Sequence, residues 1–303
     1  MDNRAVLNLP VLLPIVALMF NALVWGSSWW PFRALQSQGL HPLWTTVFVY
    51  LLAVVVIALL RPRAFMQVLR APALWLLVAA SGVTNAAFNW GVVIGDVVRV
   101  VLLFYLMPLW TVLLARVLLH EPLTRAAALR VAMALGGAAI VLWPAGGFAA
   151  AAWPLPRALP DCLGLVGGFS FALNNVMLRR EAARPQEERA LAMFLGGVLV
   201  AGSLAATLAQ QGRLPWPPAP HASWMLLALV LAALFLLSNL ALQFGAARLP
   251  ANVTSVVMLS EVVFASASAI ALGGGQLTAP LLAGGGLIVG AAVLAASGRA
   301  TAH

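Results

Sequence analysis

The sequence predicts an all-α integral membrane protein, with ten transmembrane helices arranged as two inverted five-helix repeats. Of its 303 residues, 63% are hydrophobic and only 8% are charged, whereas a soluble domain carries about 25% charged residues. The apolar residues gather in runs long enough to cross a bilayer, and the second half of the chain repeats features of the first. This composition excludes a soluble fold.

The ten predicted helices follow from ten apolar runs of roughly 18 to 24 residues, each sufficient to cross about 30 Å of hydrocarbon. We expect them near residues 11–32, 43–60, 72–92, 97–119, 125–144, 159–180, 190–210, 223–246, 250–272 and 279–297. The connections between them are short and rich in Pro and Arg. None of them is long enough to form a separate soluble domain.

The arginines predict how the chain is oriented. With the N-terminus in the cytoplasm, twelve of the seventeen arginines fall on the inner side and four on the outer side, and Arg116 lies within a helix. Because cytoplasmic connections are enriched in basic residues, we expect both termini in the cytoplasm of a bacterium and the protein in its inner membrane. No basic run lies on a polar surface, so the net charge of +9 does not indicate a nucleic-acid partner.

The two halves of the chain share features at a constant separation. The pairs Trp75 and Trp224, Asn89 and Asn239, and Gly95 and Gly245 are 149 or 150 residues apart. Five crossings are an odd number, so the second repeat enters the membrane from the opposite side, as in the inverted repeats of many secondary transporters. The predicted repeats are residues 11–144 and 159–297.

Two of the predicted helices contain a residue that is unfavourable in lipid. Pro108 falls within the helix at 97–119, and Glu261 lies near the middle of the helix at 250–272. Such residues persist where neighbouring helices or a wet cavity accommodate them, so we expect a solute path along these two helices. Pro108 should bend its helix, and this bend is either a hinge or a fixed shape.

Three short motifs accompany these helices. They are Trp25-Gly26-Ser27-Ser28, the Pro108 helix ending in His120-Glu121-Pro122-Leu123-Thr124, and Arg248-Leu249-Pro250-Ala251 leading into Glu261. Together they resemble the EamA repeats of the drug/metabolite transporter superfamily, over nearly the whole chain. The resemblance implies a cavity lined mainly by the first, third, fourth, sixth, eighth and ninth helices, and transport of amino acids, amines or related metabolites. Val262, Gln276 and the segment 47–50 depart from the common pattern of that family.

Glu261 is the strongest candidate for a functional group, because the other seven acids map to termini, loops or helix ends. Burial near the bilayer midplane disfavours the charged form of a carboxyl group, which suits a residue that exchanges protons or holds a cationic substrate group. The alternative is a protonated side chain that bonds to a neighbouring helix and has only a structural role.

Several amides are further candidates for substrate binding. Asn85 and Asn89 lie one helical turn apart, as do Asn239 and Gln243, so each pair presents its amides on one helix face. Together with Asn174, these side chains can hydrogen-bond to the polar groups of a substrate. Interhelical bonding is the commoner use of an amide inside a membrane.

Aromatic residues complete the predicted site. Trp90, Tyr105 and Trp110 lie deep in the chain's apolar runs or beside the two unusual helices, and Trp25 belongs to the first motif. Their rings can stack on an apolar substrate or hold a cation against a ring face. Packing against lipid or against other helices is the structural alternative.

The sequence therefore predicts a secondary active transporter that exports small amino-acid-like or amine metabolites by alternating access. An efflux pump for hydrophobic or quaternary ammonium cations is the alternative within transport, and a membrane-embedded enzyme or receptor is a third possibility. No catalytic residue set, metal-ligand cluster or cofactor motif is found in the sequence. The expected partners are a small-molecule substrate, the lipid bilayer and protons as a candidate coupling ion. The sequence does not indicate whether the protein is a monomer or an oligomer.

Overall fold

The structure, a computed structural model, describes residues 9–94, 100, 103–141, 158–272 and 278–297. Within these ranges all regular secondary structure is helical, with no strand. The prediction of an all-α fold is thereby confirmed. Both chain ends and positions 97–99, 101–102 and 142–144 of the predicted helices lie outside the described residues.

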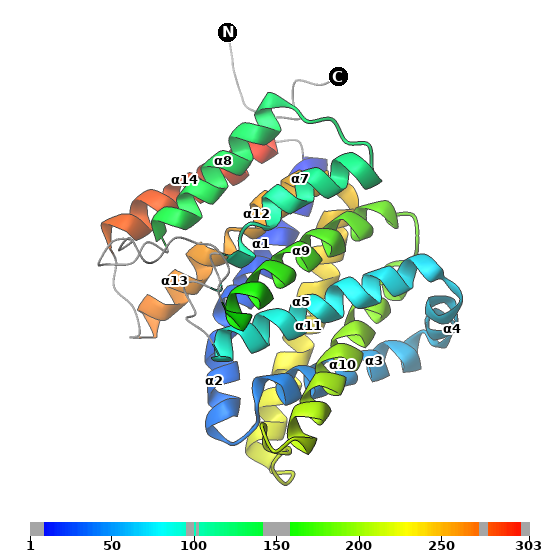
Figure 1. Ribbon diagram of the computed structural model, residues 1–303. Coiled ribbons are helices and arrows are strands. Elements are labelled where there is room, and N and C mark those ends of the chain that lie inside the picture. Colours follow the sequence, from blue (N-terminus) through cyan, green and yellow to red (C-terminus); the bar gives the residue numbers. More distant parts are fainter. Residues whose placement is uncertain (1–8, 95–99, 101–102, 142–157, 273–277, 298–303) are drawn as a thin grey trace.

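The described helices follow the predicted ranges closely (Figure 1). In the first half they are α1 (Leu9–Ser27), α2 (Trp29–Ser37), α3 (Pro42–Leu60), α4 (Pro62–Arg70), α5 (Pro72–Ile94), α7 (Met107–Leu118) and α8 (Arg125–Val141). In the second half they are α9 (Leu159–Arg180), α10 (Gln186–Gln210), α11 (Ala222–Arg248), α12 (Ala251–Met258), α13 (Glu261–Ala271) and α14 (Ala279–Ser297). Each of the ten predicted ranges overlaps one of these helices or a consecutive pair of them.

Several described helices are long and apolar enough to cross a membrane. By length and hydropathy there are five such helices in the described ranges, or six if the bent pair α4 and α5 is counted as one. The shorter apolar helices are Met107–Leu118, Val253–Ala265 and Leu282–Ala291. The chain is thus a multi-span membrane protein, while the number of ten crossings stays a prediction.

Three of the helices predicted to be continuous contain a turn. The helix predicted at 11–32 has one at Ser28, between α1 and α2. The helix predicted at 97–119 has one at Tyr105 and Leu106, before α7, and the helix predicted at 250–272 has one at Leu259 and Ser260, before α13. The prediction that Pro108 bends a helix in its middle is therefore corrected, because Pro108 lies in the first turn of α7. A proline at that position removes no intrahelical hydrogen bond, since the first N–H groups of a helix have no partner within it.

Helices from the two halves pack against each other with small residues between them. α5 packs against α9 and α10, α11 packs against α1 and α3, and α8 lies beside α14 (Figure 1). A side chain on Gly196 of α10 would collide with the carbonyl group of Val78 on α5. Such contacts are typical of membrane proteins, because small residues let membrane helices approach closely.

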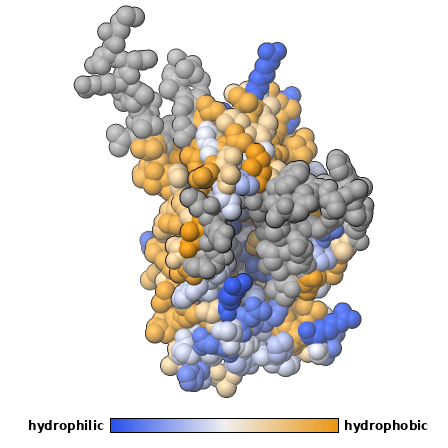
Figure 2. Space-filling model, turned by 90° about the vertical axis from the view of Figure 1, so that its left-hand side faces the viewer, coloured by the Kyte–Doolittle hydropathy of each residue, from blue (hydrophilic) through white to orange (hydrophobic). Residues whose placement is uncertain are grey.

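The surface is hydrophobic over wide areas, as expected for a protein in lipid. Leu59 is 76% exposed and Val117 is 70% exposed, and many other large apolar side chains are exposed with them. An extensive exposed apolar surface is unusual for a soluble protein. The face shown in Figure 2 has hydrophobic flanks, hydrophilic side chains gathered toward its lower end, and a hollow at its centre. An outer surface of this kind leaves the polar groups of the chain's interior as the candidates for function.

Candidate functional site

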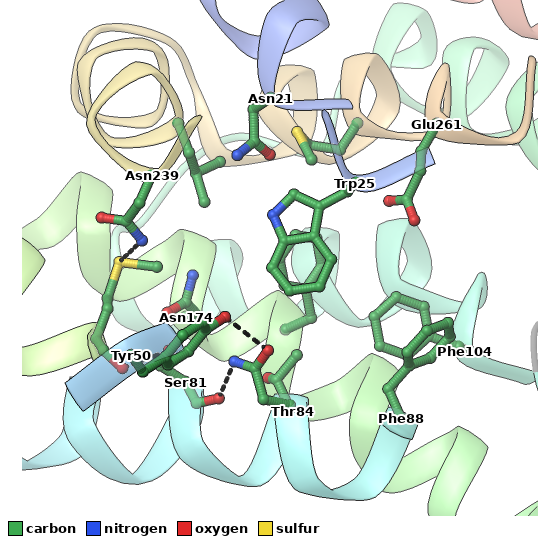
Figure 3. A pocket seen from close by; sticks show the side chains of 15 residues that line it. Asn21, Trp25, Tyr50, Ser81, Thr84, Phe88, Phe104, Asn174, Asn239 and Glu261 are labelled. Carbon is green, nitrogen blue, oxygen red and sulfur yellow. Dashed lines mark hydrogen bonds between the residues drawn. The ribbon is translucent and has the colours of Figure 1, made fainter. Parts of the chain in front are cut away.

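Helices from both halves of the chain enclose a central cavity. Its volume is about 620 Å³, including the part that opens to solvent. The lining residues are Asn21, Trp25, Tyr50, Ser81, Thr84, Asn85, Phe88, Phe104, Phe171, Asn174, Met193, Asn239, Leu242, Met258 and Glu261. Figure 3 shows the indole of Trp25 in the middle of this group, with Glu261 and Asn239 toward opposite sides of the view. The site is therefore shared between the two halves.

Glu261 brings a carboxyl group into the cavity wall. It is the first residue of α13, directly after the break at Leu259 and Ser260. Among the described lining residues it is the only acidic one, and no arginine or histidine accompanies it there. The first turn of a helix has unpaired N–H groups and a partial positive charge, so it favours a carboxylate. The break in the helix thus provides a favourable position for a carboxylate inside an otherwise uncharged wall.

α13 is held to the first two helices by bonds through Ser268. The indole N–H of Trp29 donates to the Ser268 hydroxyl at 2.9 Å. That hydroxyl lies 3.4 Å from the carbonyl oxygen of Gly26, in α1. These contacts fix the helix that carries Glu261 against the helix that carries Trp25.

A chain of hydrogen bonds holds one amide of the cavity wall in place. The Tyr50 hydroxyl donates to Oδ1 of Asn85 at 2.9 Å, and Nδ2 of Asn85 donates to the Ser81 carbonyl oxygen at 2.9 Å (Figure 3). Both amide atoms of Asn85 therefore have partners within the protein. Asn85 therefore presents an amide of fixed orientation to the cavity.

Two other amides of the wall keep atoms without a partner. Asn174 is 1% exposed, and neither its Oδ1 nor its Nδ2 has a hydrogen-bond partner. Asn21 donates from Nδ2 to the carbonyl and hydroxyl oxygens of Ser238, at 2.9 and 2.6 Å, and its Oδ1 is left without a partner. An unpaired buried amide costs roughly 1 to 3 kcal/mol, so a polar solute that bonds to these atoms would be stabilised in the cavity.

Asn239 is oriented by neighbours on both sides of its amide. Nε2 of Gln243 donates to Oδ1 of Asn239 at 2.6 Å, and Nδ2 of Asn239 lies 3.4 Å from the sulfur of Met193. Gln243 itself is fully buried outside the lining. Of the two predicted amides of α11, Asn239 thus lies at the cavity wall, and Gln243 lies behind it and holds its orientation.

Aromatic rings form the apolar part of the wall. The Trp25 ring stacks on Phe235 with centroids 4.7 Å apart, and the centroids of Phe88 and Phe104 are 4.8 Å apart. Phe171 lies against Phe104 at 5.7 Å. These rings can enclose the apolar body of a solute or face a cation.

The structure brings together half of the residues that the sequence singled out. The predicted residues that line the cavity are Trp25, Asn85, Asn174, Asn239 and Glu261. Those that do not line it are Asn89, Trp90, Tyr105, Trp110 and Gln243.

The predicted residues outside the lining have other neighbours. Nδ2 of Asn89 donates to the Thr46 hydroxyl at 2.9 Å, which is an interhelical bond between α5 and α3. The ring of Trp110 packs edge-on against Phe169, and the ring of Tyr105 packs against Phe104. Trp90 is half-buried near the end of α5.

Sequence reasoning missed most of the uncharged lining residues. Ser81 and Phe88 could have been found, because they lie four residues before and three residues after Asn85 and so share its helix face. Tyr50, Phe104 and Phe171 gave no such signal, since an aromatic residue in an apolar run is equally compatible with contact to lipid.

Two charged side chains, Glu121 and Arg179, bind the ends of neighbouring helices. Oε1 of Glu121 accepts a hydrogen bond from the backbone N–H of Ala251, the first residue of α12, at 3.3 Å. Nη1 of Arg179 donates to the carbonyl oxygen of Ala247, in the last turn of α11, at 2.6 Å. Both contacts pair a charge with the helix terminus of opposite polarity. The Glu121 bond joins the two halves, and the Arg179 bond joins α9 to α11 within the second half.

The many apolar spans define a polytopic membrane protein. Its central cavity is lined by one carboxyl group, by amides with unpartnered atoms and by aromatic rings. Residues 12–143 match the EamA-like transporter family. This match over the first predicted repeat agrees with the resemblance noted in the sequence. The family consists of membrane transporters of the drug/metabolite type.

Comparison with solved structures agrees with this fold. Among 18 matching chains, one described as "Crystal structure of protein" has a TM-score of 0.75 over 95% of this chain and 99% of its own length. The two sequences are 19% identical, so the likeness concerns the fold alone. No curated protein matches the chain.

Proposed function

We propose that this protein is a secondary active transporter that moves small amine or amino-acid-like metabolites through the central cavity by alternating access. The observation that carries the proposal is the pairing of one carboxyl group, on Glu261, with the unpartnered amide of Asn174 in the same buried cavity. A solute with an ammonium group and a second polar group would satisfy both of them.

The chemistry of the wall gives each part of such a solute a partner. The Glu261 carboxylate binds an ammonium group or, in its absence, a proton. The Asn174 amide donates to and accepts from a carboxylate, hydroxyl or amide group of the solute. The rings of Trp25, Phe88 and Phe104 enclose the carbon skeleton. Since the same carboxylate serves proton and amine in turn, proton-coupled exchange is the mechanism we propose.

Three features support alternating access by two inverted repeats, 11–144 and 159–297. The contacts of α5 with α9 and α10 are matched by those of α11 with α1 and α3, which are the corresponding helices of the other repeat. Met107 and Glu261 begin the second parts of the two helices broken before α7 and α13, and they have the same separation as the Leu-Thr pairs at 123 and 277. Broken helices at a central site are common in transporters built from inverted repeats.

Direction and location are part of the same proposal. The arginine bias supports cytoplasmic termini in a bacterial inner membrane. In that membrane protons enter the cell down their gradient, so an exchanger that takes up a proton exports its amine. We propose no enzymatic reaction, because the family that residues 12–143 match is one of transporters.

Efflux of hydrophobic or quaternary ammonium cations is the second candidate function. It is favoured by the rings of Trp25, Phe88 and Phe104, which line the same cavity as the carboxyl group and can hold a cation against a ring face. Such a cation has no N–H or O–H group to offer the Asn174 amide. Replacement of Asn174 therefore separates the two candidates, because it should weaken transport of amino-acid-like solutes and leave quaternary ammonium transport unchanged.

Uptake into proteoliposomes tests the proposal. A labelled panel of amino acids, polyamines and quaternary ammonium ions would be assayed with and without a pH gradient, for the wild type and for Glu261→Gln. The matched control is Glu187→Gln, which neutralises a carboxylate that is 41% exposed at the start of α10. We expect one class to accumulate in response to the gradient, Glu261→Gln to lose that response, and the control to keep it. Unchanged gradient dependence in Glu261→Gln would contradict the role of this residue.

A further inference from the structure

α4 is a short helix that lies nearly perpendicular to the helix that follows it. It contains nine residues, begins with Pro62, and turns by 98° into α5, one of the chain's spans. The segment lies in the predicted connection between the helices at 43–60 and 72–92. Nine residues rise only about 14 Å, which is too short to cross the bilayer. Figure 1 shows α4 at the edge of the molecule, near the ends of α3 and α5, a place that suits a helix at a membrane surface.

The side chains of α4 divide into three faces. Ala64 and Val68, one turn apart, are 4% and 0% exposed and pack toward α3, α5 and α10. A second face exposes three apolar side chains, which are Phe65, Met66 and Leu69, at 38%, 47% and 44%. A third face carries the exposed Arg63 and Arg70, two turns apart. Apolar and basic faces side by side are typical of helices that lie in a lipid interface.

A groove beside the start of α4 continues this surface. Its volume is about 770 Å³, including open space, and its apolar wall comes from Ile57 and Leu60 of α3 and Leu236 and Leu240 of α11. Its polar rim includes Arg61, whose Nε lies 3.8 Å from a carboxylate oxygen of Glu187, with both side chains well exposed. An exposed ion pair of this length is weak, so the guanidinium of Arg61 is free to bind an anion.

We propose that α4 and this groove bind anionic phospholipids of the adjacent leaflet. Phe65, Met66 and Leu69 insert among the acyl chains, and Arg63 and Arg70 bind lipid phosphates. The groove takes one acyl chain, with its phosphate near Arg61.

Charge selects anionic over zwitterionic lipids on this surface. The surface offers three guanidinium groups against the single carboxylate of Glu187, and near a membrane each basic side chain favours anionic lipid. The inference rests on the chain being a membrane protein and does not depend on the transported substrate.

Lipid-dependent thermal stability of the purified full-length protein in detergent tests the proposal. Phosphatidylglycerol should raise the unfolding temperature of the wild type more than phosphatidylcholine does, and added salt should reduce the difference. In R63Q and R70Q variants, the phosphatidylglycerol concentration for half of the stabilisation should rise roughly fivefold for each arginine removed. The matched control is Arg213→Gln, an exposed arginine beyond the opposite end of α10. Equal responses of R63Q/R70Q and the wild type would overturn the proposal, as would a wild type without lipid preference.

A depth measurement tests the in-plane position independently of lipid charge. A spin label on Met66→Cys, in a Cys162→Ser background that removes the exposed native thiol, should be accessible to oxygen and protected from a water-soluble nickel complex in bilayers. A label at Gln67, which is also exposed on α4, should show the opposite preference. A Met66 label that is accessible to the nickel complex would exclude insertion of this helix.

Discussion

Gly26 and Glu261 are in direct backbone contact between α1 and α13. A Cβ atom on Gly26 would lie 2.7 Å from the carbonyl oxygen of Glu261 and 2.8 Å from the backbone nitrogen of Ala265. Real Cβ atoms do not approach backbone atoms so closely. The glycine after Trp25 is therefore required for the close packing that places the Glu261 carboxyl group and the Trp25 ring in one cavity.

Gly26→Ala should separate α1 from α13. Overpacking of this kind costs about 1 to 3 kcal/mol, and it should lower the thermal midpoint in detergent and reduce transport. Gly136→Ala on α8 is the control, because no atom lies within 4 Å of the Cβ it would add. Wild-type transport by Gly26→Ala would show that the contact has room to relax.

Asn174→Leu should affect binding and stability in opposite directions. It removes an amide whose two polar atoms are buried without partners. The unfolding temperature should therefore stay the same or rise, and the free energy of unfolding should increase by at most about 1 to 3 kcal/mol. At the same time the KM for an amino-acid-like solute should rise. Thermal unfolding and uptake kinetics measure the two effects.

Asn21→Leu is the matched comparison for that variant. It removes an amide that donates two hydrogen bonds to Ser238, so it should lower the thermal midpoint. If Asn174→Leu destabilised the protein as much as Asn21→Leu does, Asn174 would be a structural residue.

Tyr50→Phe should destabilise the α3 to α5 contact. It leaves Oδ1 of Asn85 without its donor, and an unsatisfied buried acceptor costs roughly 1 to 3 kcal/mol. A double-mutant cycle with Asn85→Leu checks the cause, because the second change removes the orphaned acceptor. The double variant should be less destabilised than the sum of the single variants, and strict additivity would exclude the bond as the origin of the effect.

Glu121→Ala should open the end of the molecule at which α12 begins. A hydrogen bond to a charged group contributes about 1.5 to 3 kcal/mol, so its loss should shift the population toward an open state roughly tenfold to a hundredfold. A thiol introduced by Leu249→Cys reports this change, since Leu249 is 1% exposed and Cys162 can be replaced by serine. Maleimide should label it faster in Glu121→Ala, and at the wild-type rate in the control Glu187→Gln.

The sequence was sufficient to predict the helices, the family and the residue with the most unusual environment. Long apolar runs leave few alternatives in a membrane, and a carboxyl group such as Glu261 contrasts with every neighbour along its helix. The break before Glu261 was not predicted, because Leu259 and Ser260 are compatible with a continuous helix and only tertiary contacts decide between the two.

The faces of the helices could not be predicted from hydrophobicity. In a soluble protein the polar side of a helix points to water, but in α5 and α11 nearly every side is apolar. Asn85 and Asn89 were equivalent in the sequence, and the structure turns Asn85 to the cavity and Asn89 to Thr46. α4 was missed for a related reason, since its nine residues are too short for a periodic signal.

The cavity wall has a single carboxyl group among its described residues, and this number has an energetic consequence. One negative charge can neutralise one proton or one monovalent cation at a time, so the two compete for it. If the solute is an amine with one net positive charge, and proton and amine cross in opposite directions, a full cycle moves no net charge and is electroneutral. Such an exchanger would be driven by the pH difference alone and would be insensitive to voltage, which otherwise contributes about 2.3 kcal/mol per charge for each 100 mV.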